Sequence, residues 1–438
     1  MQTNHSRRVR QVLTAPIAVV GGGAVGVCIA SELQLAGYPV VLLERGEIGS
    51  GCSSGNSGLI SMTGLVPHAA PGVLTKLPRY LVDKNGPLTI RGTHFLQTLP
   101  WFRELLKASS AREYERIASV LAALLDRAHP QMMALIARCN CGELVRSTGT
   151  ITLHETASTY HRSLAENELR RRHGREVIDL TGKELTDLEP AISPHIYRAS
   201  LMPQNAFTTN PLRLVQSIAD DFRAKGGVVM RTEVTRVEPS QQGMSLRLSD
   251  GKTLNAQTVV LSAGAWTKSL LAPLGIKLML EPHRGYHVMA HNPGITLNHP
   301  LMWAERGFAI VPMEHGIRAA GKVEIADIDA PPDPRVPSRI LEEMRSVFRS
   351  LDTSTTSHWM GSRPATPDSL PFIGPVPGQP DIIVATGHGH LGLSMSALTG
   401  RLVTEIIAGH TPSVDLAPLA VERFATRRIV SFKEIADV

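Results

Sequence analysis

The 438-residue chain contains little cysteine, few aromatic residues and only a small excess of positive charge. Its four cysteines, Cys28, Cys52, Cys139 and Cys141, are too few for a disulfide framework and indicate a reducing compartment. Aromatic residues make up 4% of the chain, and no Lys/Arg-rich block with interleaved aromatics predicts a nucleic-acid surface. The net charge of +6 is mild, so attraction to an anionic substrate or an acidic membrane face stays open.

Metal-binding motifs and membrane-spanning runs are lacking as well. Cys139 and Cys141 have no second pair nearby, and no HExxH motif or carboxylate cluster predicts a metal site. One uncharged run, 11–31, follows two arginines and resembles a twin-arginine signal or a membrane span, but its four glycines would make a poor spanning helix. We predict a polar, basic and mobile arm over residues 1–14. We also predict a cytoplasmic protein, at most peripheral on the inner face of the cell membrane.

The run 17–44, IAVVGGGAVGVCIASELQLAGYPVVLLE, has the pattern of a strand, a phosphate loop, a helix and a second strand. Gly21 and Gly23 allow a tight turn that approaches a pyrophosphate, and Gly26 allows the helix to lie close to the sheet. Glu44 follows Gly26 by 18 residues, near the spacing at which a carboxylate reaches an adenosine ribose hydroxyl. The run therefore predicts a dinucleotide site. The alternative is a tight turn in an α/β domain.

Three further segments favour a flavin over a nicotinamide. The Gly/Ser-rich stretch 45–62 follows the second strand directly and leaves backbone amides free to face a long ligand. The stretch 257–266, QTVVLSAGAW, is a strand that ends in a small-residue turn, and 381–399 repeats the order of strand, Gly-rich turn and helix. A helix that starts near Leu391 would aim its positive end at the flavin pyrimidine.

Six segments in this order resemble the FAD-dependent D-amino acid oxidase/dehydrogenase superfamily. They are VVGGGAVG at 19–26, CSSGNSG at 52–58, AAPGV at 69–73, SAGAW at 262–266, GSRPATPDSLPFIG at 361–374 and TGHGHLG at 386–392. The resemblance is greatest to bacterial D-amino acid dehydrogenases, and the chain is also similar to glycine oxidase. It implies an α/β fold in which a discontinuous, Rossmann-like FAD-binding domain carries an inserted mixed-sheet substrate-binding domain, with FAD held non-covalently.

The resemblance also implies roles for single residues in holding FAD. The ADP half would contact Ala24, Val25, Glu44 and Arg45, with Gly21, Gly23 and Gly26 at the diphosphate and Val234 at the adenine. The stretch from diphosphate to flavin would contact Cys52, Ser53, Asn56, Ser57, Gly58 and Leu59. Ala263, Gly264 and Trp266 would close the pocket, and Gly389, His390, Leu391, Gly392 and Leu393 would line the flavin edge.

Arg363 matches the arginine with which this family binds the substrate carboxylate. Hydride transfer requires the reacting atoms within roughly 3–3.5 Å, and a bidentate arginine fixes both position and orientation. A structural ion pair is the alternative for Arg363. Tyr286 carries the nearest hydroxyl that could assist. Alternatively, its ring serves only as an aromatic wall of the pocket. Phe308 replaces a tyrosine of glycine oxidase near the carboxylate, so that second anchor is in doubt.

Two histidines complete the predicted substrate site. His390 and His68 lie in segments expected to reach the pocket, although most of the 17 histidines should be surface or structural residues. His388 is expected to brace the turn. No side-chain base is needed if the amine binds in its neutral form.

The motifs predict a discontinuous flavin domain because they lie at the start, middle and end of the chain. We assign 15–82, 181–278 and 356–438 to the FAD-binding domain, and 83–180 and 279–355 to the substrate-binding domain. Helices are expected over 101–107, 114–128, 211–225 and 338–350, and strands over 148–153, 286–290 and 308–312.

The resemblance implies oxidative deamination of D-amino acids, with electrons passed to a quinone or another acceptor. The substrate is expected to be a small amino acid with a free carboxylate. One alternative is a dehydrogenase or oxidase of secondary or small amines, such as hydroxy-D-proline, sarcosine, glycine or an opine, acting alone or with partner subunits. The other is a flavoprotein without turnover. The segment 71–107 has apolar residues among basic ones and could touch a membrane, or it could be part of the substrate domain.

Overall fold

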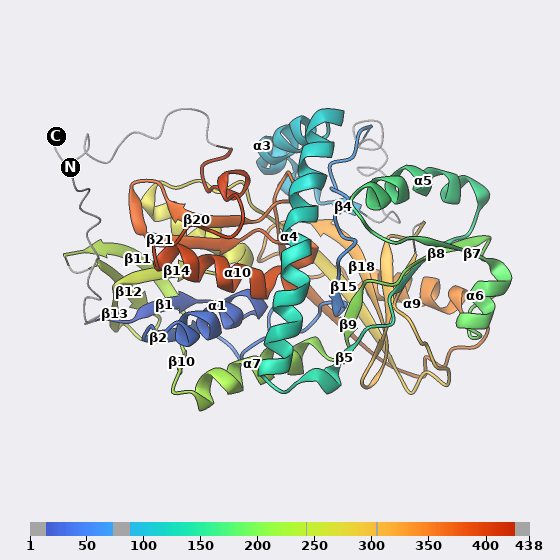
Figure 1. Cartoon of the computed structure of the whole chain (residues 1–438), viewed down its shortest axis with the longest axis horizontal. Helices are drawn as coiled ribbons and strands as arrows, with labels where there is room; N and C mark the ends of the chain where they lie inside the picture. The colour runs from blue at the N-terminus through green and yellow to red at the C-terminus, as the bar shows by residue number, and fades with distance from the viewer. Residues whose placement is uncertain (1–14, 73–87, 242, 304, 425–438) are drawn as a thin grey trace, which may run out of the picture.

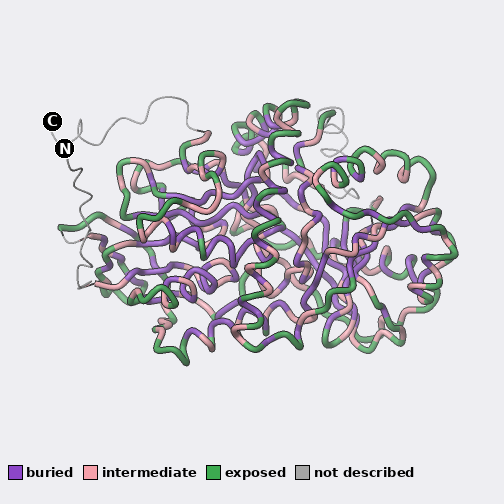
Figure 2. Tube along the Cα trace, viewed as in Figure 1, coloured by how far each residue is buried: buried purple, intermediate pink, exposed green. Residues whose placement is uncertain are grey.

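The computed structural model describes residues 15–72, 88–241, 243–303 and 305–424. Two large sheets lie side by side along the long axis of the molecule, with the helix α4 between them in the view of Figure 1. Buried backbone runs through both sheets, as Figure 2 shows. The expected arm over 1–14 and the part 73–87 of the segment 71–107 lie outside the described residues.

The first sheet is built around the predicted strand–loop–helix–strand unit. Its order is β10-β2-β1-β14-β21-β20, and all neighbours are parallel except β20. The strands are β1 Ile17–Val20, β2 Val40–Glu44, β10 Val228–Arg231, β14 Thr258–Leu261, β20 Phe372–Val376 and β21 Gln379–Thr386. The four central strands are mainly apolar and buried, apart from the first three residues of β21, as expected where both faces of a parallel sheet are covered.

Helices cover one face of this sheet, and a small antiparallel meander lies against the other. The helices are α1 Ala24–Leu35, α4 Ala111–Arg138, α7 Pro211–Ala224 and α10 Gly392–Ile407, and α1 contacts both α10 and α7 while α10 contacts α4. The meander consists of β11 Val234–Ser240, β12 Gly243–Leu248 and β13 Thr253–Ala256. Asn210 caps α7, where its side chain accepts a hydrogen bond from the amide of Arg213.

The second sheet is mixed and has the order β19-β15-β18-β17-β16-β6-β8-β7, with β4 beside β18. Its strands are β4 Leu88–Ile90, β6 Thr150–His154, β7 Ile178–Thr181, β8 Arg198–Met202, β15 Glu281–His291, β16 Leu301–Trp303, β17 Phe308–Met313, β18 Gly316–Ile325 and β19 Thr355–Ala365. An apolar core that includes Trp303, Val288 and Ile340 joins one face of this sheet to α9 Arg335–Val347 and α6 Gly182–Leu188. The helix α5 Ala157–Arg172 contacts β6 and β8.

Short elements join the two sheets. A three-stranded sheet consists of β3 Leu59–Ile60, β9 Ala206–Thr208 and β5 Val145–Arg146. The helix α3 Gly92–Ala108 precedes α4, and α8 Thr267–Leu271 follows β14.

The sequence-predicted elements are confirmed, although several run longer than expected. The helices expected over 101–107 and 114–128 are parts of α3 and α4, and α9 begins three residues before the expected 338. The ranges assigned to the two domains stay a prediction. The strand β19 pairs with β15 in the second sheet, and α4 packs against α10 of the first.

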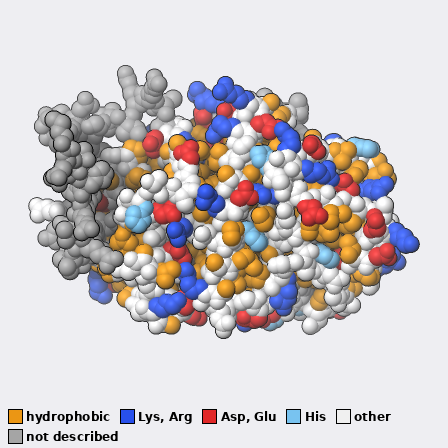
Figure 3. Space-filling model, in the orientation of Figure 1, with side chains coloured by type: hydrophobic (Ala, Val, Ile, Leu, Met, Phe, Trp, Pro, Cys, Tyr) orange, Lys and Arg blue, Asp and Glu red, His pale blue; other side chains and the backbone are white. Residues whose placement is uncertain are grey.

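The surface carries both charges interspersed. Figure 3 shows Lys and Arg side chains alternating with Asp and Glu over the visible face. Within the described ranges, no helix is both long and apolar enough to cross a membrane. In α3, Trp101 and Phe102 are buried in the core, whereas Leu96 and Leu99 are exposed.

Candidate active site

A cavity of about 1560 Å³ begins at the carboxyl ends of β1, β2 and β14 and continues to the second sheet. Segments far apart in the chain form its walls: the β1–α1 turn, the Gly/Ser loop 50–57, the start of β11, the turn after β14, the end of β19 and the η4–α10 turn, in which η4 is the short helix Gly389–Leu391. This is the edge at which α/β sheets bind dinucleotides. Its length suits an extended ligand with a smaller one beside it.

The phosphate loop is shaped by close backbone contacts. Gly21 has φ +107°, and a Cβ there would lie 2.6 Å from the carbonyl oxygen of Ser262. A Cβ on Gly26 would lie 1.8 Å from the carbonyl oxygen of Gly21, so α1 approaches the strand as the sequence predicts. The amide of Ala24, in the first turn of α1, donates a hydrogen bond of 2.9 Å to Ser53 Oγ.

Glu44 ends β2 at the cavity wall. Its Oε2 accepts a hydrogen bond of 2.6 Å from the amide of Gly22, and its Oε1 accepts one of 2.9 Å from Gly46. The carboxylate thus bridges the phosphate loop and the next turn. Beside it, the guanidinium of Arg45 lies 4.0 Å from the ring centroid of Trp266, and both side chains line the cavity.

The Gly/Ser loop is held by residues of the second sheet that sequence analysis missed. Arg318 Nη1 donates hydrogen bonds to the carbonyl oxygens of Ser54 (3.0 Å) and Asn56 (2.7 Å). His287 Nδ1 lies 3.2 Å from the Gly55 carbonyl oxygen, and its ring stacks on Trp359. Burial lowers the pKa of Arg318 to about 10 and that of His287 to about 3, so His287 is neutral and donates.

Arg363 extends from β19 into the cavity. Its guanidinium lies against the backbone of Gly285 on β15, where an added Cβ would be 2.3 Å from Arg363 Cζ. Among the described residues, no side chain or backbone group makes a hydrogen bond or ion pair with Arg363. Burial lowers the pKa of the Arg363 guanidinium, and the nearby Cys52 has a smaller effect that raises it. An enclosed, unpaired cation is costly, so the chemistry of this position suits an anionic ligand.

His68 and His390 meet beside Arg363. His68 Nε2 and His390 Nδ1 are 2.8 Å apart, and the ring centroids are separated by 4.5 Å. Both rings face the cavity and are exposed to it. The cavity itself is enclosed by protein around the two rings. Burial lowers the pKa of both imidazoles, and the positive charge of Arg363 lowers each further. Both are therefore neutral at pH 7.

Two other histidines lie at the same end of the cavity. His388 Nε2 is 2.9 Å from Thr399 Oγ1 on α10, which agrees with the expected bracing of the turn. His283, which sequence analysis missed, faces the cavity from β15 with its ring edge-on to Trp101, and burial lowers its pKa to about 3. Its alternation with Gly285 along β15 could have indicated this face.

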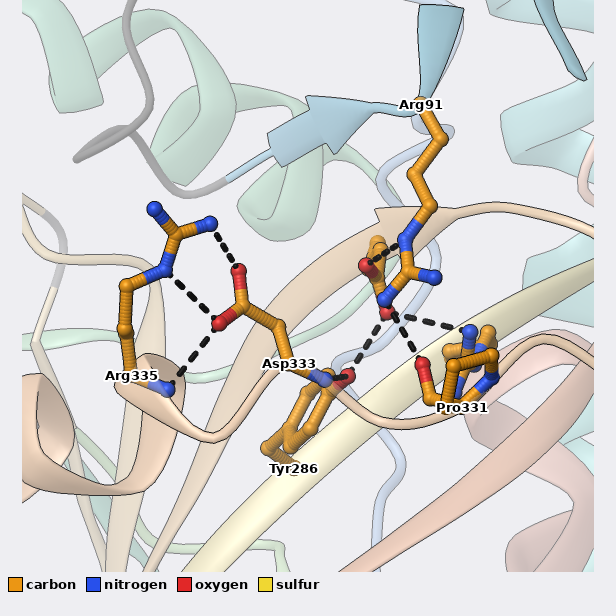
Figure 4. A network of polar contacts seen from close by, with 7 residues as sticks. Arg91, Tyr286, Pro331, Asp333 and Arg335 are labelled. Carbon is orange, nitrogen blue, oxygen red and sulfur yellow. Dashed lines mark hydrogen bonds and ion pairs between the residues drawn. The ribbon is translucent and has the colours of Figure 1, made fainter. Parts of the chain in front are cut away.

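Tyr286 does not reach the cavity, which corrects the expected role of its hydroxyl. Its side chain points to the opposite face of β15 from Gly285, into the core below the sheet. The hydroxyl donates a hydrogen bond of 2.6 Å to Glu324 Oε2 and accepts one of 2.9 Å from the amide of Asp333 (Figure 4). Burial and Glu324 raise the pKa of Tyr286 to about 12.

The same network fixes the loop before α9. Glu324 Oε1 also accepts a hydrogen bond of 2.6 Å from Arg91 Nε, and Arg284 Nη1 lies 3.4 Å from Glu324 Oε2. Arg91 Nη2 donates to the Pro331 carbonyl oxygen, so the Pro-rich break is tied to β4 and β18, as Figure 4 shows.

Most residues predicted to bind FAD or substrate line this one cavity. They are Gly21, Gly23, Ala24, Val25, Glu44, Arg45, Cys52, Ser53, Asn56, Ser57, Leu59, His68, Val234, Ala263, Gly264, Trp266, Arg363, Gly389, His390, Leu391, Gly392 and Leu393. Gly26, Gly58 and Tyr286 do not line it. Gly58 instead accepts a backbone hydrogen bond from Thr208. Phe308, which sequence analysis identified in place of a tyrosine of glycine oxidase, is buried and lines the cavity wall.

The donor set fits FAD. The first turns of α1 and α10 face the cavity, and each presents backbone amides and a positive helix end where a diphosphate and a flavin pyrimidine carry negative charge. Because the glycines of the phosphate loop have no side chains, a ligand can approach the backbone there directly. Between the two helix ends, the loop 50–57 supplies further amides along the length of the cavity.

Comparison with known proteins agrees with this geometry. The sequence matches the DAO family model, described as FAD dependent oxidoreductase, over residues 16–406. A D-amino-acid oxidase of Bradyrhizobium diazoefficiens is 32% identical over 415 residues, covering 93% of this chain and 98% of the relative.

Solved structures share the fold. Glycine oxidase from Geobacillus kaustophilus superposes with a TM-score of 0.72 at 23% identity, over 95% of this chain and 99% of that one. Iminodiacetate oxidase from Chelativorans sp. gives a TM-score of 0.70 at 17% identity, over 92% of this chain and 98% of that one. The chain therefore belongs to the DAO family of FAD-dependent oxidoreductases.

Proposed function

We propose that this enzyme oxidises a small D-amino acid to the imino acid, which water hydrolyses to a 2-oxo acid and ammonia. Bound FAD would supply the two-electron oxidant that takes a hydride from the substrate Cα. The chain's own residues bind the carboxylate, aim the Cα–H bond and enclose the reacting atoms. The relative from Bradyrhizobium, which carries the name of a D-amino-acid oxidase, supports the substrate class.

Arg363 is the observation that carries this proposal. It lines the cavity near the turn into α10, where the flavin edge is expected, and it has no hydrogen-bond or ion-pair partner among the described residues. A carboxylate placed on its two Nη atoms would be held bidentately, which fixes its plane as well as its position. An electron carrier without a substrate has no use for such a group.

The residues proposed to hold FAD are those of the phosphate loop, the loop 50–57 and the first turns of α1 and α10. Glu44 is proposed to receive the ribose hydroxyls, because its oxygens lie at the cavity wall while its two amide donors fix the carboxylate. Arg45 and Trp266 would flank the adenosine.

A secondary amine is the second candidate substrate. The cavity continues beyond Arg363 along α5, where Arg162, Ser163 and Asn167 line it. This extension leaves room for a substituent on the substrate nitrogen. Iminodiacetate, hydroxy-D-proline, sarcosine and opines would use the same carboxylate clamp.

The electron acceptor is proposed to be a quinone or another carrier. The exposed Leu96 and Leu99 on α3 are the described part of the segment that could contact a membrane or a partner subunit. Oxygen consumption during turnover would instead assign an oxidase.

Anaerobic mixing of the FAD-loaded protein with a panel of D-, L- and N-alkyl amino acids tests the proposal. D-amino acids should bleach the flavin absorbance within seconds, whereas L-amino acids should not. If only secondary amines bleach it, the second candidate replaces the first. If nothing in the panel bleaches a flavin that dithionite reduces, the protein has no amino acid oxidation activity of this kind.

A further inference from the structure

The histidine pair next to Arg363 has a property that neither ring has alone. The contact between His68 Nε2 and His390 Nδ1 uses one nitrogen of each ring. Within the described part of the chain, the outer nitrogens, His68 Nδ1 and His390 Nε2, have no hydrogen-bond partner, and both rings line the cavity.

A hydrogen bond between two neutral imidazoles determines which of the two outer nitrogens carries a hydrogen and which has a lone pair. If His68 donates, His390 Nε2 carries hydrogen and His68 Nδ1 has a lone pair; if His390 donates, these roles are exchanged. In both tautomers the pair presents one acceptor and one donor. A proton accepted at one end can therefore leave from the other after the central proton shifts.

The surroundings keep the pair neutral and thus able to accept. Arg363 faces the pair from β19, His283 faces it from β15, and Cys52 approaches Arg363 from the Gly/Ser loop. His388, on the same turn, also lines the cavity, and its Nε2 lies 2.9 Å from Thr399 Oγ1 of α10. Burial and the charge of Arg363 lower the pKa values of His68 and His390, which favours the neutral form of both rings.

We propose that the His68–His390 pair accepts the proton that the substrate ammonium must lose before its Cα hydride can leave. This rests on the proposed function. The N–H bond of the ammonium breaks, and an N–H bond forms at the outer acceptor nitrogen of the pair. With bound FAD supplying the hydride acceptor, the freed amine lone pair would form the C=N bond, and the proton at the other end of the pair would pass to water.

The pair is a better acceptor than Arg363, Cys52, Tyr286 or His283, since burial lowers the pKa of His283 to about 3. Arg363 has no lone pair to offer, and burial raises the pKa of the Cys52 thiol, so that no thiolate is present. The hydroxyl of Tyr286 is below the sheet. A carboxylate held by Arg363 would place the neighbouring ammonium near the pair, because both groups are bonded to the same Cα.

The first test is the pH dependence of anaerobic flavin reduction at saturating D-amino acid. The wild-type rate should be flat from pH 7 upward. In His390→Ala the rate at pH 7 should fall by about 10²–10⁴-fold. It should then rise tenfold per pH unit until the substrate's own ammonium deprotonates. His68→Ala should show the same slope with a smaller loss. If the flavin reduction rates of both variants depend on pH in the same way as the wild-type rate, the proposal is wrong.

Chemical rescue separates a proton acceptor from a packing residue. Imidazole added to His390→Ala should restore the rate, and substituted imidazoles of higher pKa should restore more of it. His410→Ala, on an exposed histidine after α10, is the matched control and should be unaffected at every pH. Absence of rescue in a variant that keeps its flavin and thermal stability would refute the role.

Histidine ¹⁵N spectra give a readout without turnover. Signals that disappear in the His68→Ala and His390→Ala variants assign the two rings. At pH 7 each should show one protonated and one unprotonated nitrogen. Two protonated nitrogens on either ring would overturn the proposal. The proposed function itself would be refuted by a different result, namely that no substrate in the panel reduces the wild-type flavin.

Discussion

Replacing Gly285 with alanine should displace the Arg363 guanidinium without changing any side chain that is proposed to contact the substrate. The new Cβ would lie 2.3 Å from Cζ and 2.4 and 2.5 Å from the two Nη atoms of Arg363. Ordinary carbon contacts start near 3.4 Å, so the guanidinium must shift by about 1 Å. The strand itself cannot yield easily, because β15 is paired on both sides, with β18 and β19.

A shift of that size has a large kinetic effect. Misplacing a reacting group by about 1 Å costs about 100-fold, which corresponds to about 2.7 kcal/mol. We therefore expect Gly285→Ala to lower kcat/KM for D-amino acids by about 100-fold while FAD stays bound. Stopped-flow flavin reduction gives the rate, and the flavin absorbance of the purified variant gives the occupancy.

The matched control is Gly142→Ala, at a position where an added Cβ meets nothing within 4 Å. It should leave kcat/KM and thermal stability unchanged. If Gly285→Ala also leaves kcat/KM unchanged at full flavin occupancy, Arg363 does not hold the substrate in the position described. A loss of flavin or of thermal stability would be visible in the same samples.

Two further predictions concern residues that sequence analysis misassigned or missed. Tyr286→Phe should destabilise the fold by about 1–3 kcal/mol, because Glu324 loses a buried donor, yet leave KM unchanged. Denaturant unfolding and steady-state kinetics measure the two effects, and a raised KM at normal stability would contradict the placement below the sheet. Arg318→Met should weaken FAD binding by about 10–100-fold, because the Gly/Ser loop loses two charged hydrogen bonds. Release of fluorescent FAD on dilution measures this against Arg247→Met, and equal release would refute the account.

Local sequence patterns were enough to predict the cofactor end of the site. The phosphate loop, the α1 contact at Gly26 and the Glu44 position are encoded within 28 consecutive residues, 17–44. Each depends on backbone geometry that glycine spacing expresses directly. The turn at 386–392 repeats the same logic, so the start of α10 could be predicted to within one residue.

The substrate end depends on pairings that no local pattern expresses. Whether Tyr286 or its neighbours face the cavity is decided by the alternation along β15, and the pairing with β18 shifts between Gly285 and Tyr286. A one-residue change in register exchanges the two faces of a strand. The sequence named the right strand and the wrong side chain.

The long-range contacts were equally hidden. His68 and His390 are 322 positions apart, and Arg318 meets the Gly/Ser loop from a distance of more than 260 positions. Motif reasoning placed both histidines near the pocket but could not show that they touch. Only the assembled sheets bring these segments together.

The carboxylate clamp is tested most directly by comparing D-alanine with D-alaninamide, which has the same shape without the charge. In the wild type, anaerobic flavin reduction should favour D-alanine by at least about 100-fold in rate over apparent dissociation constant. In Arg363→Met the preference should disappear, with FAD still bound. An equal preference for D-alanine in the variant and the wild type would contradict the assignment of Arg363.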